Sequence, residues 1–264
     1  ESSKPWVEGF IMRALSPLVS NFRAQETLEA YLTRHGVVAI DGVDTRTLTV
    51  ILRQQGSMRC GISTSEQDPE RLWARVRGAA DIVGVDLVQH VTCQREYTWP
   101  PEARGPQARA QTAQPYHVVV MDYGVKYGIL RQLAALGLRV TVLPAATRAD
   151  EVLSRRPDGV VLSNGPGDPA AVPYAVETIR GLMGQVPMLG ICLGHQLLGL
   201  AYGGQTFKLK FGHHGGNHPV QELSSGQVAI TAQNHNFAVQ VETIPGHTVE
   251  VTHQNLNDGT CEGM

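Results

Sequence analysis

Residues 186–200, VPMLGICLGHQLLGL, decide the fold class of this 264-residue chain. A short apolar strand is expected to end at Gly190, and an apolar helix is expected to follow Cys192 directly. Gly190 and Gly194 bracket the cysteine as G-x-C-x-G, the pattern of a strand-to-helix elbow in which the two backbones nearly touch and only small residues fit. The cysteine side chain is therefore predicted to stand above the carboxyl edge of a sheet.

Outward from this elbow, strands and helices alternate along the chain. Because a helix joins each strand to the next, the pattern predicts an α/β fold, with an open, mostly parallel, twisted sheet and helices on both faces. Ligands bind such sheets at the carboxyl ends of the strands, which is where the motifs of this sequence fall. Strands are expected at residues 118–121, 139–143, 159–162 and 186–191, and helices at 129–136, 149–155 and 174–183.

The thiol of Cys192 is a candidate nucleophile. It lies at a helix N-terminus, where backbone N–H dipoles favour a thiolate, and the N–H group of Leu193 is directed at a developing oxyanion. The alternative is a buried structural cysteine in a glycine-bracketed turn. The strand, elbow and helix together favour the nucleophile.

A second motif, Ser163-Asn164-Gly165-Pro166-Gly167-Asp168-Pro169, ends the strand that precedes the elbow. Two glycines that flank a proline predict a rigid, exposed backbone, which would supply a second oxyanion donor and grip a small amino-acid substrate. An ordinary turn is the alternative. A nucleotide-binding loop is not indicated, because neither G-x-x-x-x-G-K-[ST] nor G-x-G-x-x-G is present.

Two polar segments follow the elbow helix. Residues 211–219, FGHHGGNHP, have the composition of a metal cluster. Adjacent histidines on one strand or loop usually cannot both face one ion, and no cysteine or carboxylate with ligand spacing accompanies them, so no metal is expected. In residues 233–237, QNHNF, the asparagine pair either holds a polar amide substrate or forms an Asx-turn.

Composition excludes several classes of protein. Hydrophobic residues make up 42% of the chain and charged residues 17%, which supports a buried core rather than wholesale disorder. The net charge of −2, without a basic tract, argues against nucleic-acid binding, and the apolar runs are too short for a membrane span. Four widely separated cysteines and no visible signal peptide indicate a reducing, cytoplasmic setting.

The first 97 residues hold helices and short strands but no chemical motif. Asp44 and Asp68-Pro69-Glu70 predict two helix starts. Residues 98–115 are rich in proline, glycine, alanine and glutamine and predict a linker. The expected organisation is therefore an N-terminal α/β domain over residues 1–97, a linker over 98–115 and the main domain over 116–264.

Residues 190–196 resemble the nucleophile elbow of class I, triad-type glutamine amidotransferases, and residues 163–169 resemble their oxyanion-strand loop. Three further segments narrow the resemblance to the small, glutamine-hydrolysing subunits of carbamoyl phosphate synthetases: residues 122–126, 210–220 and 233–235. In the N-terminal segment, residues 20–23 and 38–46 agree. The resemblance runs from Glu1 to Gly263 and implies the class I glutamine amidotransferase fold.

The resemblance also implies roles. Cys192 would attack the glutamine amide, form a γ-glutamyl thioester and release ammonia, while the N–H groups of Leu193 and Gly165 stabilise the oxyanion. Glycine is the residue expected at position 236; asparagine tolerates φ > 0, so a backbone contact is expected to survive there. The glutamine-binding positions carried over are Gly165, Gly167, Leu193, Gln196, Asn234, Asn236 and Phe237.

The implied partner is a large subunit, in a heterodimer or higher oligomer. That subunit uses ATP, magnesium and bicarbonate, receives the ammonia through an internal tunnel, and makes carbamoyl phosphate for arginine and pyrimidine biosynthesis. No cofactor is expected in this chain, which agrees with its lack of a phosphate loop.

Relative to that family, the chain is expected to be truncated at both ends, and a serine that helps bind glutamine is expected to precede Glu1. The family's catalytic histidine and glutamate lie in an H-P-E segment that this sequence does not contain, so the 264 residues alone are expected to be inactive. Nothing in the sequence pairs His195 or His235 with an orienting carboxylate. The alternatives are a non-catalytic, amidotransferase-like scaffold or binding subunit, and an unrelated α/β hydrolase with a cysteine nucleophile.

Overall fold

The computed structural model describes residues 2–100 and 115–264. These residues form two compact units that divide between Asp81 and Ile82. From the sequence, the division is expected after residue 97 instead. Most of the linker predicted over residues 98–115 lies outside the described residues.

Local pairing explains why the segment after Asp81 packs with the second unit. Strand β3 (Tyr97–Thr98) pairs antiparallel with β5 (Arg139–Pro144). The backbone N–H of Cys93 donates a hydrogen bond of 2.8 Å to the carboxylate of Asp122. These contacts involve residues without a periodic apolar pattern, which is why the sequence alone does not reveal them.

The first unit contains three helices, and two of them begin where the sequence predicts. Asp44 and Asp68 accept hydrogen bonds from the backbone N–H groups of Thr47 and Glu70, and Pro69 occupies the first helical position. These caps satisfy N–H groups that have no partner within the helix. The elements of this unit are β1 (Gly9–Ile11), α1 (Leu28–Arg34), β2 (Val38–Ile40), α2 (Thr45–Gln55) and α3 (Pro69–Gly78), and β1 and β2 pair in parallel.

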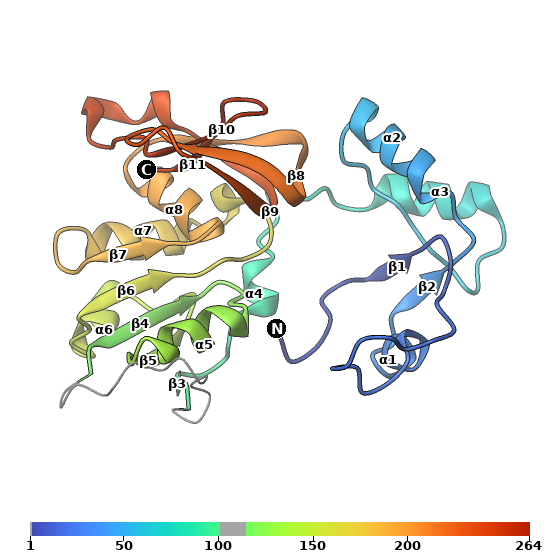
Figure 1. The fold of residues 1–264 in the computed structure, drawn as a ribbon, viewed down its shortest axis with the longest axis horizontal. Coiled ribbons are helices and arrows are strands. Elements are labelled where there is room, and N and C mark those ends of the chain that lie inside the picture. The colour runs from blue at the N-terminus through green and yellow to red at the C-terminus, as the bar shows by residue number, and fades with distance from the viewer. Residues whose placement is uncertain (1, 101–114) are drawn as a thin grey trace. The chain divides into compact units, whose positions relative to one another are not determined.

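The second unit is built on a five-stranded sheet in the order β3-β5-β4-β6-β7, in which all pairs except β3–β5 are parallel (Figure 1). The open, mostly parallel sheet predicted from the sequence is therefore confirmed, and each predicted strand and helix is present. The remaining elements of this layer are α4 (Val88–Val91), β4 (His117–Asp122), α5 (Tyr127–Ala135), α6 (Ala149–Ser154), β6 (Gly159–Leu162), α7 (Pro173–Leu182), β7 (Met188–Gly190) and α8 (Leu193–Ala201).

Alternate residues of the central strands face two apolar layers. Val119 and Met121 of β4 pack in one cluster with residues of α6, α7 and α8, whereas Val118 and Val120 pack in another with Leu130 of α5. All six residues of β4 are buried, as expected for a central strand covered on both faces. This packing fixes the carboxyl ends of β4, β6 and β7 at one edge of the sheet.

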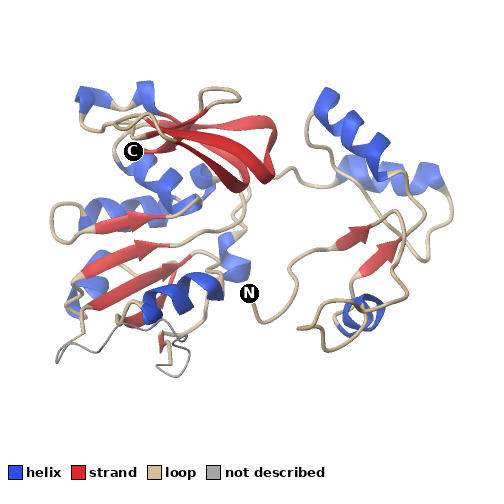
Figure 2. Cartoon of the chain, in the orientation of Figure 1, coloured by secondary structure: helices blue, strands red, loops and turns tan. Residues whose placement is uncertain are grey.

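A second, antiparallel sheet follows α8, in the order β11-β10-β8-β9. Its strands are among those drawn as red arrows in Figure 2. Its strands are β8 (Gln205–Glu222), β9 (Val228–Gln240), β10 (His253–Asn255) and β11 (Cys261–Gly263). The segment Asn257-Asp258-Gly259, whose residue types are typical of a hairpin turn, lies between β10 and β11. Among residues 2–100 and 115–264, none of the helices has the length and apolar character that crossing a bilayer requires.

Candidate active site

Cys192 occupies the elbow between β7 and α8 with φ 53° and ψ −108°. Among the described non-glycine residues, only Arg156 shares a positive φ. Such strained backbone in a residue other than glycine clusters at functional sites.

The two bracketing glycines meet the steric demand predicted from the sequence. A Cβ atom at Gly190 would lie 2.7 Å from the backbone nitrogen of His195, and one at Gly194 would lie 2.6 Å from the carbonyl carbon of Leu162. Both distances are shorter than any side chain tolerates, and both partners are backbone atoms that cannot rotate away. The elbow therefore requires glycine at both positions.

Two backbone N–H groups converge on the Cys192 side chain, those of Leu193 and Gly165. The first belongs to the first turn of α8, and the second to the loop after β6. That loop is fixed by side-chain hydrogen bonds: the Asn164 amide accepts from the backbone N–H of Lys126 at 3.1 Å and donates to the carbonyl of Gly124 at 3.0 Å. Two backbone N–H donors beside a nucleophile are the groups that an oxyanion hole requires.

The thiol differs in one respect from the sequence expectation. Burial raises the pKa of the Cys192 thiol, and it outweighs the N–H groups of Leu193 and Gly165 and the charge of Lys126, which act to lower that pKa. The charge of Glu262 acts in the same direction as burial. The helix N-terminus therefore does not by itself produce a thiolate in this unliganded site, because desolvation dominates.

The predicted glutamine-binding residues fall into two groups in the structure. Gln196 of α8 donates through Nε2 to the backbone carbonyl of Phe237 in β9 at 2.6 Å, which joins the elbow helix to the 233–237 segment. Gly167 lies in the loop after β6, with φ 90° and the side chain of Leu87 against it. Cys192, Leu193 and Gly165 therefore form one group around the sulfur, and Gln196 of α8 with Phe237 of β9 forms a second.

Asn234 and Asn236 meet at His214, which lies directly opposite Asn234 on β8. The two ring nitrogens of His214 lie 2.9 Å from Asn234 Oδ1 and 3.3 Å from Asn236 Oδ1. The segment is extended strand rather than an Asx-turn, and Asn236 has no positive φ, contrary to the expectation that asparagine replaces glycine there for its backbone freedom. Its side chain instead makes a contact with His214 that glycine cannot make.

A buried cluster of ionisable groups lies behind this segment. His213 and His235 are directly opposite each other on β8 and β9, and their rings meet edge to face at 4.8 Å between centroids. The carboxylate of Glu262 on β11 lies 3.2 Å from His213 Nδ1 and 3.5 Å from His235 Nε2. The other nitrogen of His213 lies 2.7 Å from the carboxylate of Asp258.

Among the described residues, His213, His235 and Glu262 offer the atom types of a metal site within 4.8 Å of one another. The Asn255 amide already donates to Glu262 at 2.9 Å and lies 3.4 Å from His213 Nδ1. The Asn255 amide therefore already engages Glu262 within this cluster. As predicted from the strand period, His213 and His214 face opposite sides, one buried and one exposed.

Sequence reasoning missed Glu262, Asp258 and Asn255, and it found no carboxylate for His235. These residues come from β10, β11 and the turn between them, far from the histidines in the chain. The only indication of these contacts in the sequence is the turn-forming segment at residues 257–259, which predicts that the following strand, β11, pairs with β10. Nothing in the sequence specifies which strand β10 joins.

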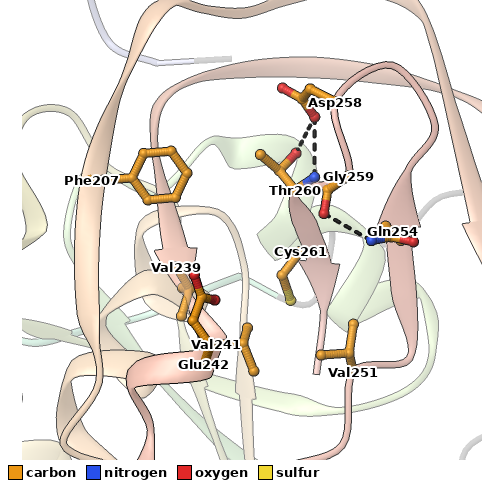
Figure 3. A pocket seen from close by; sticks show the side chains of 10 residues that line it. All are labelled: Phe207, Val239, Val241, Glu242, Val251, Gln254, Asp258, Gly259, Thr260 and Cys261. Carbon is orange, nitrogen blue, oxygen red and sulfur yellow. Dashed lines mark hydrogen bonds between the residues drawn. The ribbon is translucent and has the colours of Figure 1, made fainter.

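A cavity of about 400 Å³ lies in the same unit but is not the candidate site (Figure 3). Its wall includes none of the residues predicted to bind glutamine. Cys261 projects into it, and burial raises the pKa of that thiol to about 11. The complete lining is Phe207, Val239, Val241, Glu242, Val251, Gln254, Asp258, Gly259, Thr260 and Cys261.

Sequence similarity to known proteins extends over the whole chain. Residues 119–264 match the family Glutamine amidotransferase class-I, and residues 1–62 match the family Carbamoyl-phosphate synthase small chain, CPSase domain. The chloroplastic carbamoyl phosphate synthase small chain of Oryza sativa subsp. japonica is 49% identical over 266 residues, an alignment that covers 100% of this chain and 59% of that protein. The carbamoyl phosphate synthase small chain of Syntrophotalea carbinolica is 50% identical over 270 residues, with 100% of this chain and 71% of that protein covered.

The chain thus spans between 59% and 71% of the length of these two relatives. Among solved structures, a glutamine amidotransferase from Thermotoga maritima is 17% identical with a TM-score of 0.43, covering 56% of this chain and 70% of that chain.

Proposed function

This chain belongs to the family of carbamoyl phosphate synthase small chains, and from that membership we propose that it hydrolyses glutamine to glutamate and ammonia for a large, ATP-dependent partner. The observation that carries the proposal is the convergence of the Leu193 and Gly165 N–H groups on the sulfur of Cys192. A buried structural cysteine needs neither two converging donors nor a strained backbone.

The chemistry follows from that arrangement. The Cys192 sulfur attacks the side-chain amide carbon of glutamine, and the carbonyl oxygen takes the negative charge between the two N–H groups. The carbon–nitrogen bond then breaks, and ammonia leaves with one added proton, so that a γ-glutamyl thioester remains on the sulfur. Water attacks the thioester, glutamate leaves, and the thiol is restored.

Burial and the two donors together suit this sequence of steps. A neutral thiol at rest protects the nucleophile, whereas bound substrate and a general base provide the driving force for its ionisation. By family resemblance, that base is the histidine of the H-P-E segment, oriented by its glutamate. His195 and His235 are not assigned the role, because His195 is partly buried with a lowered pKa, chiefly through desolvation, and His235 is paired with Glu262.

We assign the unit formed by residues 2–81 to association with the large subunit. Several large apolar side chains of this unit are exposed, with Phe22 at 90% and Leu18 at 77% exposure. Apolar side chains that gather on a surface are typical of a protein–protein interface. The further exposed apolar side chains of this unit include Trp6, Val7, Phe10, Val19, Ile40 and Trp73. The ammonia is expected to pass to the large subunit, which combines it with bicarbonate.

The test is the Cys192→Ser variant in the presence of the large subunit. Glutamine-dependent synthesis should fall by on the order of 10⁶, the effect of removing the nucleophile from a comparable triad. Synthesis from added ammonia should remain, because it bypasses the thioester. Retained use of glutamine would instead support the alternative in which this chain is a non-catalytic scaffold. Loss of both activities would show that Cys192 maintains the structure of the complex.

A further inference from the structure

The ring of His235 is held between two groups that can only accept hydrogen bonds. Its Nδ1 lies 2.8 Å from the backbone carbonyl oxygen of Phe237, and its Nε2 lies 3.5 Å from the carboxylate of Glu262. A carbonyl and a carboxylate both require a proton on the nitrogen that faces them. The geometry therefore favours the doubly protonated imidazolium, whose Nε2 makes no hydrogen bond but lies at ion-pair distance from Glu262 in a largely buried position.

This histidine is part of a clamp on the predicted substrate segment. The carbonyl of Phe237 accepts from His235 at 2.8 Å and also from Gln196 Nε2 at 2.6 Å. Gln196 belongs to α8, the helix that begins directly after Cys192. One carbonyl oxygen thus fixes the 234–237 segment to the elbow helix, and Glu262 fixes the histidine that completes the clamp.

Glu262 itself is held on its other side. One carboxylate oxygen lies 3.2 Å from His213 Nδ1 and accepts from the Asn255 amide at 2.9 Å, while the second oxygen faces His235. The carboxylate therefore bridges β8, β9 and β10 from its place on β11. Because it occupies a fixed position, it determines where the His235 ring lies.

We propose that Glu262 is a positioning residue for glutamine: by holding the His235 ring against the Phe237 carbonyl, it keeps the 234–237 segment in register with the elbow helix. The inference rests on the proposed function, since it concerns how that same site binds its substrate. Glu262 acts through His235 rather than by touching the reacting atoms.

The charges around His235 give this role a pH dependence. The groups that face it are Glu262 on β11, Asp258 in the preceding turn, His213 on β8 and His195 on α8. Burial acts to lower the pKa of His235, but Glu262, together with the Phe237 carbonyl, outweighs it and raises the pKa. The clamp is therefore complete below that raised pKa and weakens as the pH rises through it, because a neutral Nε2 lone pair then faces the carboxylate.

The experiment compares Glu262→Gln with Glu262→Asp and with Asp258→Asn, a control that changes a carboxylate of the same cluster that contacts His213 directly and acts on His235 only through its charge. The readouts are KM and kcat for glutamine between pH 6 and 9, in the purified protein with its large partner, and synthesis from added ammonia. In the wild type, KM should rise severalfold across this range.

For Glu262→Gln, KM at pH 6.5 should increase by about tenfold, in line with coupling within contacting networks, while kcat changes less. The rise of KM with pH should disappear or move to lower pH, because the carboxamide can donate to a neutral His235. Glu262→Asp keeps the charge and should retain the pH dependence even if its shorter reach raises KM. Asp258→Asn should keep the pH dependence of KM, displaced only slightly to lower pH, because Asp258 is the smallest of the effects that raise the pKa of His235.

Wild-type KM and pH profile in Glu262→Gln would overturn this inference and leave the proposed function intact. Changes of KM and pH profile in Asp258→Asn equal to those in Glu262→Gln would also overturn it, as would loss of the pH dependence in Glu262→Asp. Either result would show that Glu262 only stabilises the sheet and does not position His235. If the wild-type complex itself fails to use glutamine, the proposed function fails instead. Should Glu262→Gln not fold, the Glu262→Asp profile alone decides the question.

Discussion

Replacing Gly165 by alanine tests the oxyanion hole directly. The added Cβ would lie 2.6 Å from Leu193 Cδ2 and 3.0 Å from the carbonyl carbon of Tyr123, and it would press on the Tyr123 carbonyl oxygen as well. Tyr123 is fully buried, and its N–H donates to Ser163 Oγ at 2.9 Å, so its backbone cannot retreat. The loop that carries the Gly165 N–H must therefore move away from Cys192.

The size of the effect follows from two separate costs. Overpacking a well-filled site typically lowers the free energy of unfolding by about 1 to 3 kcal/mol. Loss of one oxyanion donor typically lowers kcat by about 10² to 10³, or about 2.7 to 4 kcal/mol in the barrier. We expect both in Gly165→Ala, because the same displacement causes both.

The assay measures glutamine-dependent kcat, synthesis from added ammonia, and urea unfolding. Gly216→Ala is the matched control, since a Cβ at Gly216 meets nothing within 4 Å and the residue does not have a positive φ. The control should stay within about 0.5 kcal/mol of the wild type in stability and keep its kcat. A Gly165→Ala protein that is destabilised but has wild-type kcat would refute the assignment of this N–H to the oxyanion, and full stability would refute the steric argument.

Three further outcomes are expected. A glutamine-like electrophile such as a diazo-oxo-norleucine should label Cys192, because the two N–H donors and the substrate residues surround it. It should spare Cys60, Cys93 and Cys261. Peptide mapping that finds the label mainly on another residue would contradict this prediction. Burial, followed by the charge of Asp122, raises the pKa of Cys93 to about 12, which keeps that thiol neutral. Deletion of residues 2–81 should weaken association with the large subunit more than it perturbs the sheet around Cys192. Unchanged association in analytical ultracentrifugation would be evidence against an interface on these residues. The deletion stops at residue 81 because a deletion that continued through residue 98 would remove β3 from the sheet. Burial lowers the pKa of His117, so the native ring stays neutral and stability should fall as the pH drops through the unfolded-state value of about 6.5. His117→Gln should therefore show a smaller change of Tm between pH 8 and pH 5.5, and an unchanged difference would show that His117 does not titrate with unfolding.

The sequence by itself determined the elements from β4 to α8 of the second unit and the elbow between β7 and α8, because their signals are local. A buried strand such as β4 requires consecutive apolar residues, and a helix start requires a cap such as Asp68. The glycines at positions 190 and 194 are required by backbone atoms a few residues or one strand away. The resemblance to a known family rested on the same short segments.

The boundary between the units and the state of the nucleophile depended on tertiary structure. Residues 82–100 pack with the second unit through β3 and Asp122, contacts that no periodicity announces. Desolvation of Cys192 depends on everything packed around it, so a helix N-terminus alone could not predict the direction of its pKa. Asn236 likewise needed the position of His214 to explain its side chain.

Only the tertiary structure brought Glu262 to His235. Strand register places His213 and His235 opposite each other, and a separate pairing, that of β10 with β8, brings β11 and its carboxylate to the same buried point. The alternation of a strand predicts which face a residue occupies, but the register of one strand against another is a long-range property. The sequence therefore identified the nucleophile and its loop, whereas the charged cluster behind the substrate segment arose from the pairing of strands distant in the chain.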